Sequence, residues 1–206
     1  MRIGVLALQG AFIEHEDIVR SLGADSLPVR LPRHLGEVDG LIIPGGESTT
    51  IGKLARRWGL LEPLRTFARS ERPVWGTCAG MILLASEVAD RAPDQPLLGV
   101  LDVTVRRNAF GRQIDSFETD VNVPVLGERP YSAVFIRAPL VERVGEGVRV
   151  LAELDDGTVV AVQQNHLLAT AFHPELTDDD RFHRYFLEIV QSHGGRSASG
   201  PNGIHQ

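Results

Sequence analysis

The 206-residue sequence contains a single cysteine, Cys78. One thiol cannot form an intramolecular disulfide, and it cannot build a zinc or iron–sulfur centre that needs several cysteine ligands. Long apolar runs are also missing, since none approaches the ~20 residues that a membrane-spanning helix needs. The apolar run at residues 3–8 is too short for a span, and it lacks a small-residue cleavage site. These absences predict an unanchored, cytoplasmic protein without a membrane partner.

Positive charge is scarce as well, because 21 lysines and arginines stand against 27 aspartates and glutamates, for a formal net charge of −6. Non-specific nucleic-acid binding needs a surplus of cations, so this balance argues against a nucleic-acid partner. The chain is 43% hydrophobic, which is enough to form a packed core and excludes a disordered protein. We expect one domain over residues 1–191 and a mobile polar tail over residues 192–206.

Strands and helices are predicted to alternate in the first half of the chain. Buried strands are expected at 3–8, 41–43 and 73–75, an extended segment at 27–31, and helices at 12–22, 48–58 and 81–85. The first helix has its apolar positions at Ile13, Ile18, Val19 and Leu22. Ser48 or Thr49 is the expected cap of the second helix. This alternation predicts a parallel sheet with helices on both faces.

The second half is predicted to contain mostly strands. They are expected at 100–105, 117–123, 131–136, 148–154, 159–163 and 167–172, with a hairpin turn at 155–157 and a closing helix at 178–191. Strands without intervening helices add antiparallel pairs to a parallel sheet. The expected fold is therefore α/β, a three-layer αβα sandwich whose central sheet is mixed but mainly parallel.

The most informative segment is Gly76-Thr77-Cys78-Ala79-Gly80. A G-x-nucleophile-x-G pentapeptide between a buried strand and a helix is typical of a sharp turn that exposes a nucleophile. The N-terminus of the following helix favours the thiolate form of the sulfur. A lone cysteine is otherwise often an inert buried residue, but the flanking glycines and the strand-to-helix context favour a nucleophile here.

A cysteine nucleophile needs a base, and the base needs a group that orients it. Both occur in Phe172-His173-Pro174-Glu175, directly after a predicted strand. Pro174 disfavours a helical conformation at His173, and in an extended chain the side chains of His173 and Glu175 share a face. The alternative is an ordinary surface turn. Most other histidines are expected to face solvent, and only His15 and His166 compete for the role of base.

Two further segments are candidates for substrate binding. Pro44-Gly45-Gly46-Glu47-Ser48 follows a predicted strand, and its glycines free backbone N–H groups to face an oxyanion. It does not fit a Walker loop, and the dinucleotide-binding glycine pattern is absent. Arg107, in a cationic loop, and Arg137 can each bind a carboxylate through the guanidinium group, or can simply face solvent.

Five segments stand together in an order that resembles the class I glutamine amidotransferases, whose fold is flavodoxin-like. They are residues 4–10, 44–49, 76–81, 107–118 and 172–177. The cysteine turn and the His-Pro-Glu segment resemble the superfamily as a whole. The Pro-Gly-Gly-Glu-Ser-Thr loop and the Arg-Asn-x-Phe-Gly-Arg-Gln stretch resemble more narrowly the glutaminase subunits of two-component pyridoxal 5'-phosphate synthases. The resemblance extends from about residue 3 to residue 190.

The resemblance implies a role for individual residues of this sequence. Cys78 corresponds to the nucleophile, His173 to the base and Glu175 to the orienting carboxylate. The L-glutamine pocket would include Gly46, Glu47, Ser48, Arg107, Ile136 and Arg137. The backbone N–H groups of Gly46 and Ala79 would form the oxyanion hole, and Gln9 would lie in a loop that faces the partner. Neither a metal nor a cofactor is implied.

The resemblance also implies a partner, a synthase subunit built as an oligomeric (β/α)8 barrel. It would condense the ammonia with a pentose phosphate and a triose phosphate in vitamin B6 biosynthesis, and the isolated glutaminase would be nearly inactive. Three alternatives stay open at this point. The same glutaminase could serve another synthase, such as one that makes imidazole glycerol phosphate. A partnerless cysteine hydrolase could act on other γ-glutamyl compounds, or the chain could be a non-catalytic scaffold.

Overall fold

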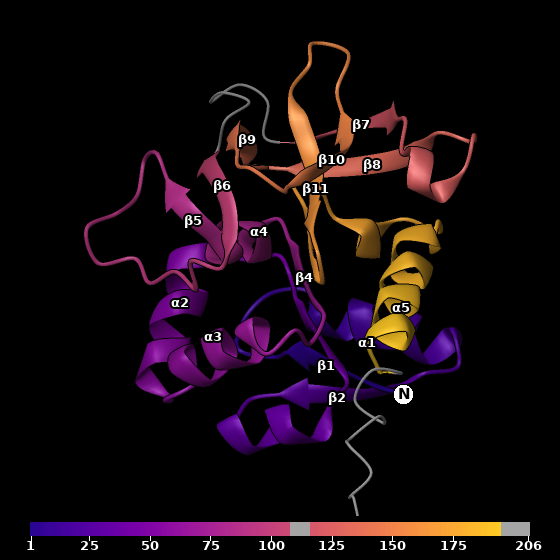
Figure 1. Cartoon of the computed structure of the whole chain (residues 1–206). Coiled ribbons are helices and arrows are strands. Elements are labelled where there is room, and N and C mark those ends of the chain that lie inside the picture. Colours follow the sequence, from indigo (N-terminus) through magenta and orange to yellow (C-terminus); the bar gives the residue numbers. More distant parts are fainter. Residues whose placement is uncertain (108–115, 195–206) are drawn as a thin grey trace, which may run out of the picture.

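The computed structural model describes residues 1–107 and 116–194, and it shows a central sheet with helices packed on both faces (Figure 1). The strands are β1 (Arg2–Leu6), β2 (Asp25–Val29), β3 (Gly40–Ile43), β4 (Val74–Thr77), β5 (Ala85–Val88), β6 (Leu101–Arg106), β7 (Ser116–Val121), β8 (Tyr131–Ile136), β9 (Leu140–Val144), β10 (Arg149–Glu153), β11 (Val159–Gln164) and β12 (Leu167–Thr170). The helices are α1 (Phe12–Ser21), α2 (Ser48–Arg57), α3 (Leu61–Arg69), α4 (Ala79–Leu84) and α5 (Arg181–Gly194), with short 3-10 turns η1 (Pro32–Glu37), η2 (Pro124–Leu126) and η3 (Pro174–Leu176).

The parallel half of the sheet has the strand order β2-β1-β3-β4-β12. β1, β3 and β4 are built almost entirely from buried residues, as expected for strands with helices on both faces. The parallel pairing of β4 with β12 brings Thr77 opposite Thr170. The carboxyl ends of two strands that lie far apart in the sequence therefore meet at one edge of the sheet.

The other half of the sheet is mixed. β11 pairs antiparallel with β10, β12 and β9, β9 pairs antiparallel with β6, and β6 pairs parallel with β5. The turn at residues 155–157 joins β10 to β11, which confirms the predicted hairpin. β7 and β8 form a separate two-stranded sheet. This arrangement confirms the predicted α/β fold with a mixed central sheet.

Several elements differ from the sequence-based expectation. β5, β9 and α3 were not anticipated, because β5 and β9 are short strands with polar residues and α3 contains a proline in its first turn. The cap of α2 is Glu47, whose carboxylate accepts hydrogen bonds from the backbone N–H groups of Thr49 and Thr50, and the prediction of Ser48 or Thr49 was wrong. α5 continues to Gly194, and residues 195–206 of the expected tail lie outside the described residues.

α1 and α5 cover the same face of the sheet, since His15 of α1 and His183 of α5 are in direct contact there. α1 also departs from the expected apolar stripe. Ile13 is 57% exposed, whereas His15 and Glu16 are buried together with Val19. His15 and His183 are thus two histidines that do not face solvent. The buried face of α1 is occupied in part by polar side chains.

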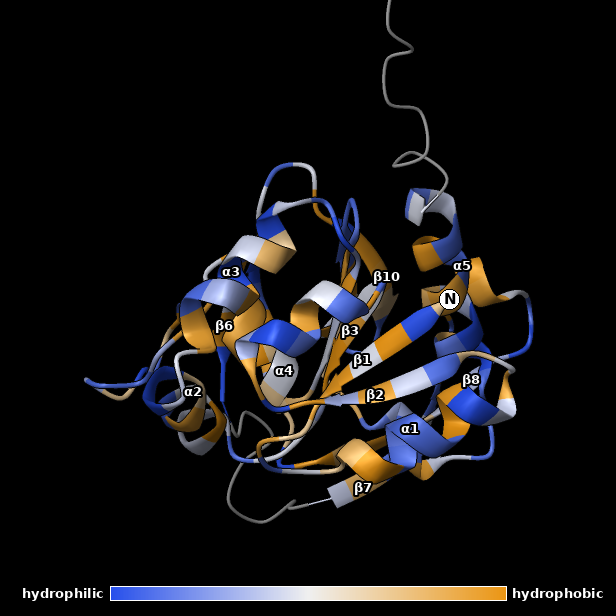
Figure 2. Cartoon of the chain, turned by 90° about the horizontal axis from the view of Figure 1, so that it is seen from below, coloured by the Kyte–Doolittle hydropathy of each residue, from blue (hydrophilic) through white to orange (hydrophobic). Residues whose placement is uncertain are grey.

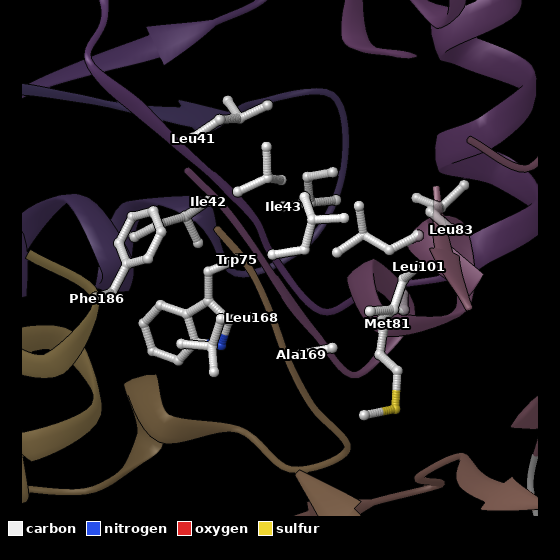
Figure 3. Packing of buried hydrophobic residues seen from close by; sticks show 14 of the residues in the cluster. Leu41, Ile42, Ile43, Trp75, Met81, Leu83, Leu101, Leu168, Ala169 and Phe186 are labelled. Atoms are coloured by element: carbon white, nitrogen blue, oxygen red, sulfur yellow. The ribbon is translucent and has the colours of Figure 1, made fainter. Parts of the chain in front are cut away.

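The core lies between the sheet and its helices. Trp75 in β4 is fully buried, pairs in register with Ile42 of β3 and Leu168 of β12, and packs against Phe186 of α5 (Figure 3). Figure 2 shows β1 coloured as hydrophobic over most of its length, in line with its position inside the sheet. This packing fixes the position of the edge at which β4 and β12 end.

Candidate active site

Cys78 lies directly after β4, at the N-terminal cap position of α4. Its backbone has φ 48° and ψ −103°, a conformation that is rare for a residue with a side chain and occurs often at functional turns. A Cβ at Gly80 would collide with the carbonyl oxygen of Ile43, and one at Gly76 would lie 2.5 Å from the backbone of Gly80. Both glycines are therefore needed for α4 to pack this closely on β3 and β4.

His173 lies at the end of the neighbouring strand. Its backbone N–H donates to the carbonyl oxygen of Val134 (2.8 Å), and its Nδ1 lies 2.7 Å from Oε1 of Glu175. The contact between His173 and Glu175 was expected, but the local geometry differs, because Glu175 lies in the 3-10 turn η3 rather than in an extended chain. Both side chains are almost fully buried. The parallel pairing of β12 with β4 brings His173 beside Cys78, and the two residues line the same cavity.

The electrostatics of the site favour a charged His173. Burial alone lowers the pKa of His173, but the hydrogen bonds and negative charges of Cys78 and Glu175 outweigh burial and raise it to about 10. Burial likewise acts to raise the pKa of Glu175, yet its contacts with His15 and His173 hold that pKa well below its usual range. At neutral pH the arrangement therefore contains an imidazolium between a carboxylate and the cysteine sulfur. An imidazolium in this position stabilises a thiolate.

A cavity of about 320 Å³ opens over Cys78 and His173. Its wall includes seven residues that the sequence analysis assigned to the substrate pocket or the partner-facing loop: Gln9, Gly46, Glu47, Ser48, Arg107, Ile136 and Arg137. Ala79, the other expected oxyanion residue, is the first residue of α4 and is buried. A larger hollow of about 490 Å³ lies over β7, β8 and η3, but neither a cysteine nor a histidine lines it, so the smaller cavity is the candidate site.

Sequence reasoning missed Ile82, which also lines the cavity. The signal was available, because Ile82 lies four residues after Cys78 on α4 and residues at that spacing share one face of a helix. The Ile136 carbonyl oxygen is 3.9 Å from the cysteine sulfur. Apolar side chains beside Cys78 reduce the contact of its sulfur with water.

The loop before α2 is tied to the loop before α1. Oε1 of Gln9 accepts a hydrogen bond from the backbone N–H of Glu47 (2.8 Å), and a Cβ at Gly46 would lie 2.5 Å from that same oxygen. The carboxylate of Glu47 is occupied as the cap of α2. Burial acts to raise the pKa of Glu47, but hydrogen bonds from Thr50 and Thr49 lower it overall. Glu47 therefore presents its backbone to the cavity while its side chain is already engaged.

The two arginines of the cavity differ in their surroundings. Arg107 is held by Asp90, whose carboxylate lies 3.4 Å from Nε and whose carbonyl oxygen accepts from Nη2 at 2.7 Å. Arg137 is exposed, has φ 42°, and forms no salt bridge with any residue in the described ranges. The rest of the cationic loop, residues 108–115, lies outside the described residues. Arg137 is therefore the arginine whose guanidinium is available to a ligand carboxylate.

Of the two histidines that compete with His173, only His15 reaches the site. Its Nε2 lies 3.3 Å from Oε2 of Glu175, on the side of the carboxylate away from His173. His166 instead contacts the carbonyl oxygen of Ala68 in α3. The helical spacing that places His15 beside Val19 on the buried face of α1 was the signal for its burial.

Metal-binding clusters and membrane-spanning helices are both absent from the described residues. No group of three or more histidine, cysteine, aspartate or glutamate side chains is arranged to hold a metal ion within residues 1–107 and 116–194. In the same ranges no helix is long and apolar enough to cross a bilayer.

Comparison with known proteins adds relatives that cover nearly the whole chain. The SNO glutamine amidotransferase family matches residues 5–192. A protein from Herpetosiphon aurantiacus named "Pyridoxal 5'-phosphate synthase subunit PdxT" is 64% identical over 190 residues, which are 92% of this chain and 100% of that protein. A Roseiflexus protein with the same name is 60% identical over 189 residues, again 92% of this chain and 100% of the relative.

Solved structures agree with these relatives. One described as a crystal structure of glutamine amidotransferase has a TM-score of 0.86 and 51% identity, and the match covers 92% of this chain and 98% of the other. The crystal structure of a putative GMP synthase component from Thermoplasma acidophilum has a TM-score of 0.70 at 18% identity and covers 97% of this chain and 98% of the other. At that identity the second match shows a shared fold only.

Proposed function

Since the chain belongs to the SNO glutamine amidotransferase family, we propose that its cavity hydrolyses the side-chain amide of L-glutamine to glutamate and ammonia. It acts as the glutaminase subunit of a pyridoxal 5'-phosphate synthase and supplies ammonia for vitamin B6 biosynthesis. The observation that carries this proposal is the buried contact of Cys78, His173 and Glu175 at the end of two adjacent strands. Relatives at 64% and 60% identity that carry the same subunit name support the assignment.

The first chemical step forms a bond between the sulfur of Cys78 and the amide carbon of glutamine. The electron pair of the carbonyl moves onto its oxygen, and two backbone N–H groups, those of Gly46 and Ala79, are the proposed oxyanion hole. One such donor typically contributes ~10²–10³ in rate. Collapse of the tetrahedral intermediate breaks the carbon–nitrogen bond, and the proton from His173 leaves with the nitrogen as ammonia.

The second step regenerates the enzyme. His173, now neutral, accepts a proton from a water molecule as the water oxygen attacks the thioester carbon. The carbon–sulfur bond breaks, glutamate leaves, and the thiolate of Cys78 again faces the imidazolium of His173. Glu175 keeps the Nδ1 proton of His173 in place, so that only Nε2 exchanges protons with the reacting groups.

Glutamine is proposed to bind with its side-chain amide at Cys78 and its α-carboxylate toward the exposed Arg137. Gly46, Glu47, Ser48, Arg107 and Ile136 complete the pocket, and all of them line the cavity. The cavity of about 320 Å³ is within the range of small-molecule sites. Asp90 accepts a hydrogen bond from Arg107 and holds it in place, so Arg107 forms part of the pocket wall.

The proposed partner is an oligomeric (β/α)8-barrel synthase subunit that receives the ammonia, with the loop of Gln9 facing it. Ammonia is mostly protonated at neutral pH and is then a poor nucleophile, so direct transfer to the synthase preserves its reactivity. We propose a cytoplasmic location for the complex. We expect the isolated chain to release little glutamate and to become active when the synthase subunit is added.

The test uses the complex of this chain with the synthase subunit of its own organism. In the Cys78→Ala variant, glutamate release from L-glutamine is expected to fall by at least about 10³-fold, because the nucleophile is lost. Product formation from added ammonium salt by the same complex should persist, since it bypasses Cys78. A Cys78→Ala complex that releases glutamate at the unmodified rate would rule out the proposal.

A further inference from the structure

A pair of buried histidines lies behind the proposed catalytic residues and has no part in the chemistry described so far. His15 is 0% exposed and His183 is 1% exposed. Nδ1 of His15 lies 2.9 Å from Nε2 of His183, and Nε2 of His15 lies 3.3 Å from Oε2 of Glu175. Among the described residues this carboxylate oxygen has no partner that meets hydrogen-bond geometry, and His15 is the group in ion-pair contact with it. His15 is therefore the one polar group positioned to stabilise the half of Glu175 that His173 does not touch.

The packing around the pair keeps both rings in place. The ring of Trp75 meets His15 edge-on at 5.7 Å and His183 edge-on at 4.9 Å. Trp75 itself is held by a hydrogen bond from Nε1 to Oγ1 of Thr170 (3.2 Å). These contacts join α1, α5 and β4 around one polar chain, formed by His183, His15 and Glu175, inside an apolar core.

The contacts determine which nitrogen of each histidine carries the proton. Nδ1 of His183 is buried and has no hydrogen-bond partner among the described residues, so a proton there would be an unpaired buried donor. The proton of His183 therefore belongs on Nε2, which donates to Nδ1 of His15. His15 then carries its own proton on Nε2, directed at Glu175. The opposite assignment would place a lone pair of His15 against the carboxylate.

The charged and polar groups around His15 agree with this assignment. Besides its contact with Glu175, Nε2 of His15 lies 3.4 Å from Oγ1 of Thr77, and that hydroxyl oxygen can accept a hydrogen bond from it. Glu16, the next residue on α1, pairs with Arg20 at 2.6 Å. Burial holds the pKa of His183 well below its ordinary value, and the neighbouring His15 lowers it further. His183 is thus neutral, and with its proton on Nε2 it is the donor to His15.

We propose that His15 and His183 are positioning residues, in which His183 sets the tautomer of His15 and His15 orients the ionised Glu175 toward His173. This inference rests on the proposed glutaminase function, because it concerns the geometry of the same site. Without His15, the buried network of Glu175, His173 and Cys78 loses a hydrogen-bond donor next to the carboxylate of Glu175. The ionisation of Cys78 then requires a higher pH.

The experiment compares His15→Phe, which keeps a ring but removes both nitrogens, with His15→Gln, whose amide can still donate to Glu175. His166→Gln is the matched control, since that histidine contacts Ala68 away from the site. In the complex with the synthase subunit, His15→Phe should lower kcat by about tenfold or more, the value expected when a buried carboxylate loses a donor. KM for glutamine should stay within about twofold, because His15 does not line the cavity.

A second measurement does not depend on glutamine or on the partner. Cys78 is the single cysteine of the chain, so its alkylation by iodoacetamide reports the pH at which the thiolate forms. The inflection of the alkylation rate plotted against pH should move to higher pH by about one unit in His15→Phe. In His183→Phe it should also move to higher pH, but by less. His15→Gln and His166→Gln should stay near the unmodified chain.

The outcomes separate the two proposals. If the unmodified complex releases no glutamate, the glutaminase function is wrong, while the alkylation profile still tests the role of His15. If His15→Phe and His15→Gln lose the same amount of kcat, and the pH at which alkylation of Cys78 sets in does not change, His15 only fills space. That outcome would overturn the inference. If His15→Phe does not fold, an unshifted inflection in His183→Phe would overturn it in the same way.

Discussion

The residues of the site show a buried charge network in which every charge depends on a partner. Burial opposes the charged forms of both His173 and Glu175, yet their contacts with each other and with Cys78 and His15 reverse that effect. A group in such a network cannot be changed alone, because its partner is then left buried without compensation. The imidazolium of His173 is the member on which the proposed proton transfers depend.

Replacing Glu175 with glutamine should move the alkaline limit of activity to lower pH. The carboxylate helps to raise the pKa of His173 to about 10, so without it that pKa falls toward its ordinary value near 6.5. Above that pH the variant lacks the imidazolium that protonates the leaving amide nitrogen. The measurement is kcat/KM for glutamine against pH in the complex with the synthase subunit. An alkaline limb that stays in place would contradict the role assigned to Glu175.

At the scale of elements, the contact of α4 with β3 and β4 positions Cys78, the proposed nucleophile. Glycines at both ends of the Gly76–Gly80 turn allow the helix to approach the strands, and the turn holds Cys78 in a strained conformation. The preceding loop is positioned in a different way, through the cap that Glu47 provides for α2 and the bond from its N–H to Gln9. The site therefore lies on element ends that the sheet holds in place.

Gly80→Ala should reduce both stability and activity. The new Cβ collides with the backbone oxygen of Ile43, which has no flexible side chain that could move aside, and overpacking of this kind costs about 1–3 kcal/mol. The shift of α4 displaces Cys78 from His173. Gly36→Ala is the control, since its Cβ meets nothing within 4 Å. Urea unfolding and glutamate release measure the two effects, and a Gly80→Ala protein as stable and active as Gly36→Ala would contradict this account.

At the scale of the whole molecule, the sheet order decides which distant segments form the site. β4 and β12 are neighbours, and α1 and α5 cover the same face, so the polar chain from Cys78 to His183 joins both ends of the sequence. The same series of polar groups links stability to pH, because the pKa values of its titratable members differ between the folded and unfolded states.

We expect His183 to make the fold sensitive to mild acid. Its pKa is lowered in the folded protein, first by burial and then by His15, while in the unfolded chain it is near 6.5. Below that pH only the unfolded chain takes up the proton, so the free energy of unfolding falls by up to ~1.4 kcal/mol per pH unit. His173 has a raised pKa, so its contribution is complete below pH ~6.5 and is lost as pH rises through about 10.

The contribution of Glu175, whose folded pKa is lowered, is present above pH ~4.5 and is lost only at lower pH. It therefore does not mask the effect of His183 in mild acid. Urea unfolding of the isolated chain at about pH 7 and about pH 5.5 measures the effect. His183→Phe should lose less stability between these conditions than the unmodified chain does. Equal losses would show that His183 does not control the acid response.

The sequence by itself determined the α/β class, most strands of the sheet, and the candidates Cys78, His173 and Glu175. Apolar runs and glycine-flanked turns are local signals, and they are strong here because the central strands are buried on both faces. Only the tertiary structure decided that Glu47 rather than Ser48 caps α2, and that β5 and β9 complete the sheet.

The contact of His15 and His183 behind Glu175 also came from the tertiary structure alone. A histidine in an amphipathic helix carries no local mark of its partners. Its role depends on which helices pack on the same face of the sheet, and that is a property of contacts between residues far apart in the chain. Local patterns thus predicted which groups could react, while long-range packing decided which groups hold them in position.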